Sequence, residues 1–150
     1  LLVEIQALVA RANFGMPERK VSGVDYNRVS MLLAILEKRI GLKLGGQDIF
    51  VNIVGGVQID EPAADLGIAM TIASSFKEKV IPSDIVFVGE VGLGGEVRSV
   101  SQIEIRLKEA QRLGFKRAVI PKDNAKGIGK ELGIERIEVC YLSEAVEIIG

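Results

Sequence analysis

Apolar residues in this chain alternate between a spacing typical of strands and a spacing typical of helices. Residues 3–9, 20–24 and 48–59 predict strands, and residues 26–40 carry an apolar helical stripe that stops at Gly41. That stripe consists of Val29, Leu32, Leu33, Leu36 and Ile40. Because 150 residues make about one ordinary domain, we expect a single mixed α/β domain over residues 1–150.

The second half continues the same alternation. Pro62 at a first helical position, with Asp60 near the cap, predicts a helix over 62–78 whose core side chains are Leu66, Met70, Ala73 and Phe76. We expect IVFVGEV, GLGG and EVRSV to form a hairpin, which is followed by a helix over 102–113. A strand AVIPK and a possible short helix come next. The chain then continues with a strand IEVCYL and a terminal helix capped by Ser143.

Composition limits the chemistry. The chain has no histidine, which removes Ser-His-Asp and Cys-His nucleophile systems and most zinc sites, so covalent catalysis would need a base such as lysine. The net charge is −1, and nucleic-acid binding would therefore need a local basic patch.

The chain also lacks the marks of a secreted or membrane protein. No apolar run approaches the ~20 residues of a membrane span, and Glu4 and Gln6 interrupt the apolar start, unlike a signal peptide. Cys140 is the single cysteine, so it cannot form a disulfide within the chain, and its apolar neighbours predict a small core residue. We expect a cytoplasmic protein, and the start without methionine in apolar sequence suggests a piece of a longer one.

Two other patterns that can carry chemistry have ordinary explanations. The turns at Gly55-Gly56, 92–95 and 127–129 match neither common phosphate-loop pattern, and hairpin or loop geometry explains them better. Ser74 and Ser75 stand near Lys77 and Lys79, but hydroxyls at a helix end more often bond the backbone than attack a substrate.

The stretch IDEPAADLGIAM, followed by VFVGEVGLGGEVRSVSQIEIRLKEAQRLGFKRAVIPKDN, resembles the proteolytic domain of Lon-type Ser-Lys proteases. In that family a serine stands in a helix-starting turn and a lysine on the next helix is its base. The resemblance places Ala63 at the serine and Glu104 at the lysine, so both catalytic groups are absent and no catalytic residue is assigned. An S-x-x-E capping box over 101–104 explains Glu104 better than an unknown catalytic carboxylate does.

The whole chain resembles one branch of that superfamily, the C-terminal Lon-like domain of the RadA (Sms) family of bacterial DNA-repair proteins. The resemblance runs through FGMPERKVSGVDYNRVSMLLAILEKR, GGQDIFVNIVGGVQIDEPAADLGIAMTIASS and VGEVGLGGEVRSVSQIEIRLKEA. It implies the α/β fold called ribosomal protein S5 domain 2-like. It also implies a hexamer-forming, DNA-binding scaffold in an ATPase that drives branch migration, with recombinase and repair proteins as possible partners. No cofactor is expected in this domain; ATP, Mg and Zn would bind only in the missing part.

Basic residues are the candidates for phosphate contacts, because Lys and Arg supply salt-dependent, sequence-independent affinity for DNA. The candidates are Lys77, Lys79, Arg98, Lys116 and Arg117. Arg19 with Lys20, and Lys38 with Arg39, are alternatives or subunit contacts. A Ser-Lys peptidase with an unorthodox nucleophile stays open as the alternative function.

Overall fold

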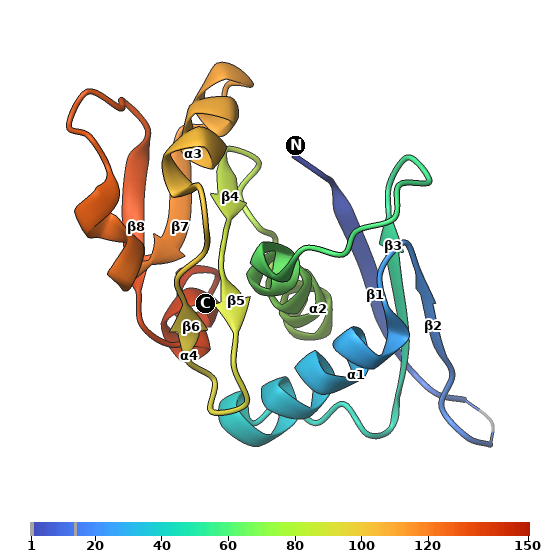
Figure 1. The fold of residues 1–150 in the computed structure, drawn as a ribbon. Helices are drawn as coiled ribbons and strands as arrows, with labels where there is room; N and C mark the ends of the chain where they lie inside the picture. The colour runs from blue at the N-terminus through green and yellow to red at the C-terminus, as the bar shows by residue number, and fades with distance from the viewer. Residues whose placement is uncertain (1, 14) are drawn as a thin grey trace.

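Two three-stranded sheets lie on opposite sides of a central helix in the computed structural model, which describes residues 2–13 and 15–150 (Figure 1). The predicted mixed α/β class is confirmed, as an α+β domain. The central helix is α2 (Asp65–Lys77), which follows a 3₁₀ turn over Pro62–Ala64 and so fulfils the prediction of a helix over 62–78. Its buried side chains form a broad face, as expected for a helix packed between two layers: Leu66, Ile68, Ala69, Met70, Ile72 and Ala73.

The first sheet has the order β1-β3-β2, with β1 antiparallel and β2 parallel to β3. Its strands lie within or close to the three predicted ranges: β1 (Ile5–Arg11), β2 (Arg19–Ser22) and β3 (Gln47–Ile53). Alternate side chains of β3, namely Ile49, Val51 and Ile53, are at most 2% exposed on the face toward the helices. Phe14, in the expected loop between β1 and β2, lies outside the described residues.

The second sheet is parallel and has the order β4-β7-β8. Its strands are β4 (Ile85–Phe87), β7 (Arg117–Pro121) and β8 (Glu135–Val139). Helices cover both faces, as parallel sheets require: α3 (Ile103–Arg112) packs on the side of Ala118 and Ile120, and α4 (Leu142–Ile148) shares the other core cluster with Val119.

The predicted hairpin is confirmed only in its second part. β5 (Glu90–Val91) pairs with β6 (Val97–Arg98) across the glycine turn. β4, which lies in the first strand of the predicted hairpin, pairs with β7 instead. Gly89 separates the two pairings and marks the point where the chain leaves one sheet for the hairpin.

The first helix, α1 (Tyr26–Ile35), begins where the Asp25 side chain accepts the amide of Arg28. A π-helical turn over Leu36–Ile40 continues it to Gly41, whose φ of 84° ends the helix as predicted. Within residues 2–13 and 15–150, no helix is long and apolar enough to cross a membrane.

Three local predictions were wrong. The capping box over 101–104 does not form: Gln102, at φ 57°, precedes α3 without a side-chain cap, and Glu104 turns away. Ser143 does not cap α4, because the helix begins one residue earlier and Glu144 Oε1 accepts the amides of Cys140 and Tyr141, each at 2.9 Å. Cys140 is exposed rather than buried, because β8 ends before it.

Candidate functional site

The turn that starts the central helix is held tightly against the chain between β4 and β5. The amide of Gly89 donates to the carbonyl oxygen of Ala63 at 3.0 Å, and the amide of Leu66 donates to the carbonyl oxygen of Gly89 at 3.0 Å. A Cβ atom on Gly89 would lie 2.8 Å from Cγ1 of Val97. A side chain at position 89 would therefore require Val97, in β6, to move.

Ala63, which the Lon resemblance places at the nucleophile, is 5% exposed. It belongs to the same apolar cluster as Ile103 and Leu107 of α3. The start of α2 and the first turns of α3 thus meet through an apolar contact. An ion pair between Glu61 Oε1 and Arg106 Nη2, 3.3 Å apart, joins the same two segments at the surface.

Glu104, which the resemblance places at the lysine base, has a bond of its own. Its Oε1 accepts the amide of Gly129 at 2.7 Å, and this bond attaches α3 to the loop that precedes β8. The carboxylate therefore anchors a loop, and neither the predicted cap nor a base for residue 63 is formed.

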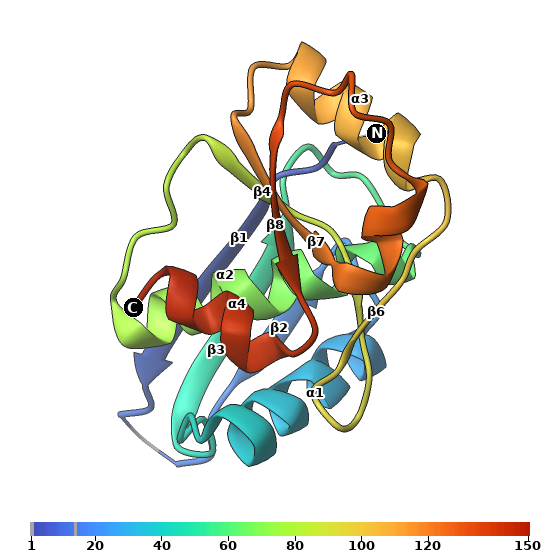
Figure 2. The same cartoon turned by 90° about the vertical axis from the view of Figure 1, so that its left-hand side faces the viewer.

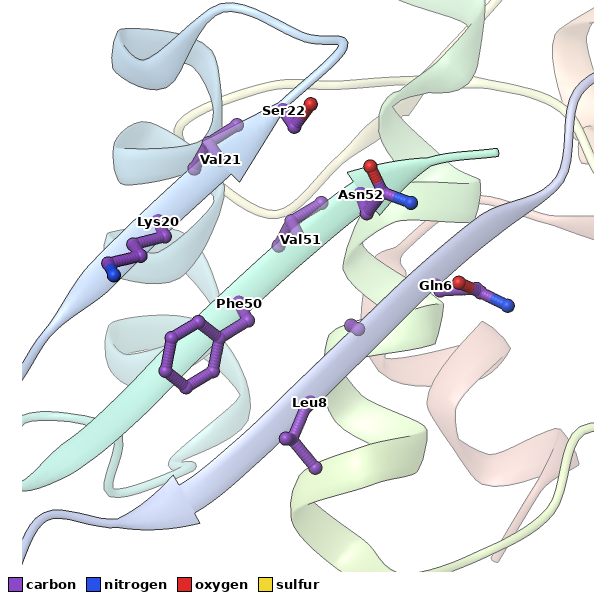
Figure 3. Close-up of a pocket in the computed structure, with 9 residues that line it drawn as sticks. Gln6, Leu8, Lys20, Val21, Ser22, Phe50, Val51 and Asn52 are labelled. Atoms are coloured by element: carbon purple, nitrogen blue, oxygen red, sulfur yellow. The ribbon is translucent and has the colours of Figure 1, made fainter. Parts of the chain in front are cut away.

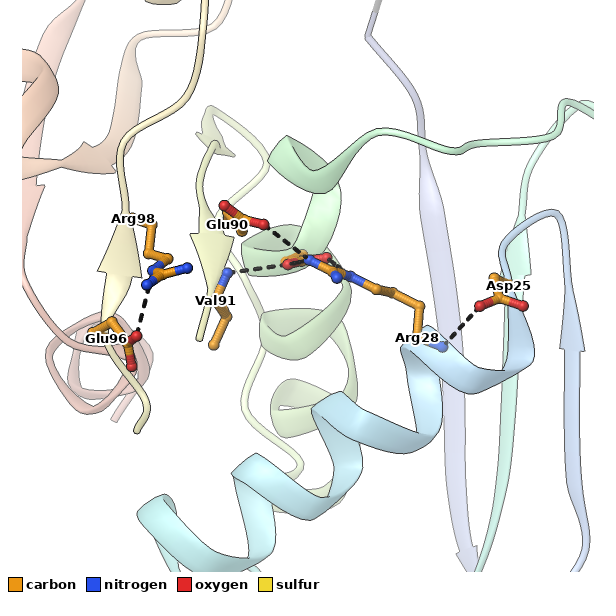
Figure 4. Close-up of polar contacts among 7 residues, drawn as sticks. Asp25, Arg28, Glu90, Val91, Glu96 and Arg98 are labelled. Atoms are coloured by element: carbon orange, nitrogen blue, oxygen red, sulfur yellow. Dashed lines mark hydrogen bonds and ion pairs between the residues drawn. The ribbon is translucent and has the colours of Figure 1, made fainter. Parts of the chain in front are cut away.

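Asp65 is a site residue that sequence reasoning missed. It stands in the first turn of α2, is 1% exposed, and is the one buried charged side chain among the described residues. Arg28 of α1 donates to both of its oxygens, from Nε to Oδ1 at 2.7 Å and from Nη2 to Oδ2, and the amide of Val91 donates to Oδ2 at 3.1 Å (Figure 4). Glu90 Oε2 lies 3.7 Å from Nη2 of the same arginine.

Burial raises the pKa of Asp65, and the hydrogen bonds from Arg28 and from the Val91 amide offset part of that rise. The bond to Asp65 raises the pKa of Arg28 in turn. Since both carboxylate oxygens already accept donors, Asp65 is not placed to take a proton from a substrate. The cluster instead connects α1, α2 and β5.

An open hollow of about 320 Å³ lies beside this cluster, between α1 and the β5–β6 hairpin. Its charged lining side chains are paired: Arg28 with Asp65 and Glu90, and Arg98 with Glu96 at 3.4 Å. The hollow therefore offers an incoming ligand no uncompensated charge from these groups.

The hydroxyls considered for a Ser-Lys pair are both bonded to backbone groups, as expected for serines at a helix end. Ser74 Oγ donates to the carbonyl oxygen of Lys79 at 2.5 Å. Ser75 Oγ accepts the amide of Val9 at 2.9 Å and so covers part of the edge of β1. These bonds oppose the use of either serine as a nucleophile.

Four of the five basic candidates lie in two pairs, one at each end of residues 78–84. Lys77 and Lys79 stand where this segment begins, at the end of α2. Lys116 and Arg117 stand where it ends, because their amides donate to the carbonyl oxygen of Asp84 at 2.9 and 3.1 Å. Figure 2 shows this segment running from α2 to β4 along the left edge of the molecule.

Two of the candidates have acidic partners. Arg117 Nη2 lies 2.8 Å from Asp84 Oδ1, and this bond lowers the pKa of Asp84. Arg98 lies apart from the other four, in the β5–β6 hairpin with Glu96.

The alternative basic residues occupy other places. Arg19 and Lys20 lie in β2 of the first sheet, where Lys20 Nζ is 3.7 Å from Glu18 Oε2 and Arg19 Nη2 donates to the Leu44 carbonyl oxygen at 3.4 Å. Lys38 and Arg39 lie in the π-helical turn, where Arg39 Nε donates to the Leu93 carbonyl oxygen at 3.3 Å.

Similarity to known proteins covers nearly the whole chain. "DNA repair protein RadA" of Bacillus subtilis is 53% identical over 146 residues, 97% of this chain and 32% of the relative. The proteins of that name from Listeria monocytogenes and Aquifex aeolicus are 52% and 47% identical over 98% and 99% of the chain, and 32% and 33% of the relatives. The chain thus spans about a third of the length of these curated relatives.

A family model described as "Subunit ChlI of Mg-chelatase" matches residues 6–124, from the first strand into the 3₁₀ helix (Lys122–Gly127) that follows β7. The match includes the start of α2, the Arg28–Asp65 cluster and the β5–β6 hairpin. Most of the chain is therefore accounted for by one family, and the chain belongs to the family described as subunit ChlI of Mg-chelatase.

Proposed function

We propose that this chain is the non-proteolytic, Lon-like C-terminal domain of a longer DNA-repair and recombination ATPase of the RadA type. It serves there as a hexamer-forming scaffold and binds duplex DNA while recombination intermediates are processed and undergo branch migration. The observation that carries the proposal is identity of about one half to proteins named DNA repair protein RadA, sustained over almost the full chain. ATP, Mg and Zn belong in this proposal to the remainder of the polypeptide.

The absence of proteolysis is supported by the residues at the helix starts. An alanine methyl cannot attack a carbonyl, and Ala63 is enclosed by apolar side chains. Incubation of the pure protein with casein should give no turnover. Turnover that disappears with Ser74→Ala or Ser75→Ala would instead favour the peptidase alternative.

Duplex DNA binding is supported by the basic residues around residues 78–84. Lys79 and Lys116 are exposed, and Lys77 is half-exposed. Arg117 is engaged by Asp84, so the three lysines are the stronger candidates for phosphate contacts. Such contacts act without base readout, and each makes the affinity fall with added salt.

Charge reversal at Lys79 and Lys116 tests this surface. In the full-length protein, Lys79→Glu with Lys116→Glu should weaken duplex binding about tenfold or more at low salt. The slope of log affinity against log salt concentration should also decrease, by about the amount that two phosphate contacts contribute. Fluorescence anisotropy with a labelled duplex, at several salt concentrations, measures both quantities.

The matched control is Lys43→Glu with Lys130→Glu, which makes the same change in net charge at two other exposed lysines. The control should bind nearly as wild type does. Equal losses of affinity in both variants would contradict the placement of the DNA-binding surface around residues 78–84. If the wild-type protein binds no duplex even at low salt, the proposal that it binds DNA is wrong.

A further inference from the structure

The outer face of the first sheet carries one charged side chain at its centre, and two acidic residues, Glu18 and Asp48, follow at one end of it. Strand register places two rows of side chains across it, Leu8–Phe50–Lys20 and Gln6–Asn52–Ser22 (Figure 3). These six residues, called here the outer sheet face, line an open hollow of about 370 Å³. Leu8 is 58% exposed although it stands directly opposite Phe50.

The composition of the outer sheet face is that of an interface. One row is led by a leucine and a phenylalanine, and the other consists of two amides and a hydroxyl. Lys20 is the single charged side chain of the six, and its Nζ lies 3.7 Å from Glu18. Interface centres are depleted of charged residues and enriched in aromatic ones, with polar groups that form hydrogen bonds across the contact.

The same composition disfavours DNA as the occupant. A DNA-binding surface gains its affinity by releasing counterions from several phosphates. One lysine beside a glutamate supplies little of that effect, so the composition fits a protein surface better than it fits DNA.

The occupant follows from the length of the relatives. They match this chain over 97–99% of its residues with only about a third of their own length, so each carries about twice as much further polypeptide. A region tethered in the same polypeptide has an effective concentration in the millimolar range, so a modest, partly polar contact suffices to hold it. Interfaces between domains are more polar than those of obligate dimers, which agrees with a face that is half amides and hydroxyl.

We propose that the outer sheet face is the docking surface for the remaining part of the same polypeptide. Leu8 and Phe50 pack against an apolar side chain of that part, and Gln6, Ser22 and Asn52 form hydrogen bonds around it. The inference rests on the proposed function in one respect only, namely that the chain is a domain of a longer protein.

Thiol accessibility in the full-length protein tests the proposal. With the exposed Cys140 replaced by serine, Gln6→Cys places a thiol on the outer sheet face, and Ser143→Cys places a control thiol on the exposed side of α4. Under native conditions N-ethylmaleimide should modify position 6 at least about tenfold more slowly than position 143, which corresponds to about 1.4 kcal/mol of protection. Equal rates at the two positions would overturn the proposal.

A pair of leucine substitutions shows whether the protection depends on this face. Leu8→Glu should restore rapid modification of position 6. Leu93→Glu makes the same change at a hairpin-tip leucine that is 69% exposed, and should leave the protection unchanged. Both positions are largely exposed, so neither change removes a core side chain. Protection that survives Leu8→Glu contradicts the proposal.

Cross-linking separates the proposed occupant from a second copy of the chain. In a mixture of isotopically light and heavy full-length protein, amine-reactive cross-links from Lys20 should join it to residues outside this domain, within one polypeptide. Links from Lys20 to this domain in a differently labelled copy would assign the face to self-association and overturn the proposal. The duplex-binding assay is independent: its failure would remove the DNA-binding role and leave the protection of position 6 unaffected.

Discussion

Two arginine–aspartate pairs of nearly equal sequence separation have opposite environments. Arg28 and Asp65 are 37 residues apart and Arg117 and Asp84 are 33 apart, and each arginine bonds its aspartate at 2.7–2.8 Å. The Asp65 side chain is 1% exposed, whereas the Asp84 side chain is 42% exposed. Burial raises the pKa of Asp65, whereas the arginine bond lowers the pKa of Asp84.

The difference shows that position, more than residue type, decides what such a pair does. Inside the protein, each charge depends on its partner, because an unpaired buried charge is costly. At the surface, water and salt replace much of what the partner supplies. The buried pair therefore holds three elements together, while the surface pair can lose a partner with little structural consequence.

The largest expected effect is that of Arg28→Ala, which leaves the Asp65 carboxylate buried without its main partner. We expect the free energy of unfolding to fall by about 3–5 kcal/mol, as measured by urea denaturation at neutral pH. Arg117→Ala, which removes the surface arginine, should shift the urea midpoint far less. Similar shifts in the two variants would break the distinction between the pairs.

A smaller loss is expected when both members of the buried pair are replaced by apolar residues. Arg28→Met with Asp65→Leu removes both charges and keeps similar volumes, so most of the stability lost in Arg28→Ala should return. Recovery should stop about 1–3 kcal/mol below wild type, because the Val91 amide loses its acceptor. Urea midpoints of the double variant and of Arg28→Ala, measured side by side, test this. A double variant no more stable than Arg28→Ala would show that the pair does more than compensate charge.

The smallest expected effect concerns pH and the surface pair. Because the folded-state pKa of Asp84 is lowered, its contribution to stability is present above the unfolded pKa of about 3.9. It is lost as the pH falls through the folded value. The difference in melting temperature between wild type and Asp84→Asn should therefore shrink as the pH is lowered below 4. A difference in melting temperature that grows on acidification would contradict the lowered pKa of Asp84 in the folded protein.

Patterns within one element could be predicted from the sequence, and contacts between distant elements could not. The apolar stripe of α1, the stop at Gly41 and the start at Pro62 are local, and the structure confirms them. The partner of Asp65 lies 37 residues away, and no local pattern selects Arg28 from the other arginines. One signal was available, namely a carboxylate within an otherwise apolar helix, which implies a buried partner.

The incorrect local predictions have related causes. Glu104 fits a capping box by spacing, but the amide of Gly129, 25 residues later, is the group that it binds. Cys140 has apolar neighbours, yet β8 ends at Val139, so the residue falls in the turn before α4. In both places tertiary contacts and element boundaries override the local pattern.

The enclosure of Ala63 bears on whether a Ser-Lys pair could be built at positions 63 and 104. A serine introduced there would place its hydroxyl in an apolar cluster with Ile103 and Leu107, out of reach of a peptide. A lysine introduced at position 104 would lose the bond that attaches α3 to the loop before β8. The helix starts would therefore have to separate before either new side chain could act, and we expect the two substitutions together to give no peptidase activity.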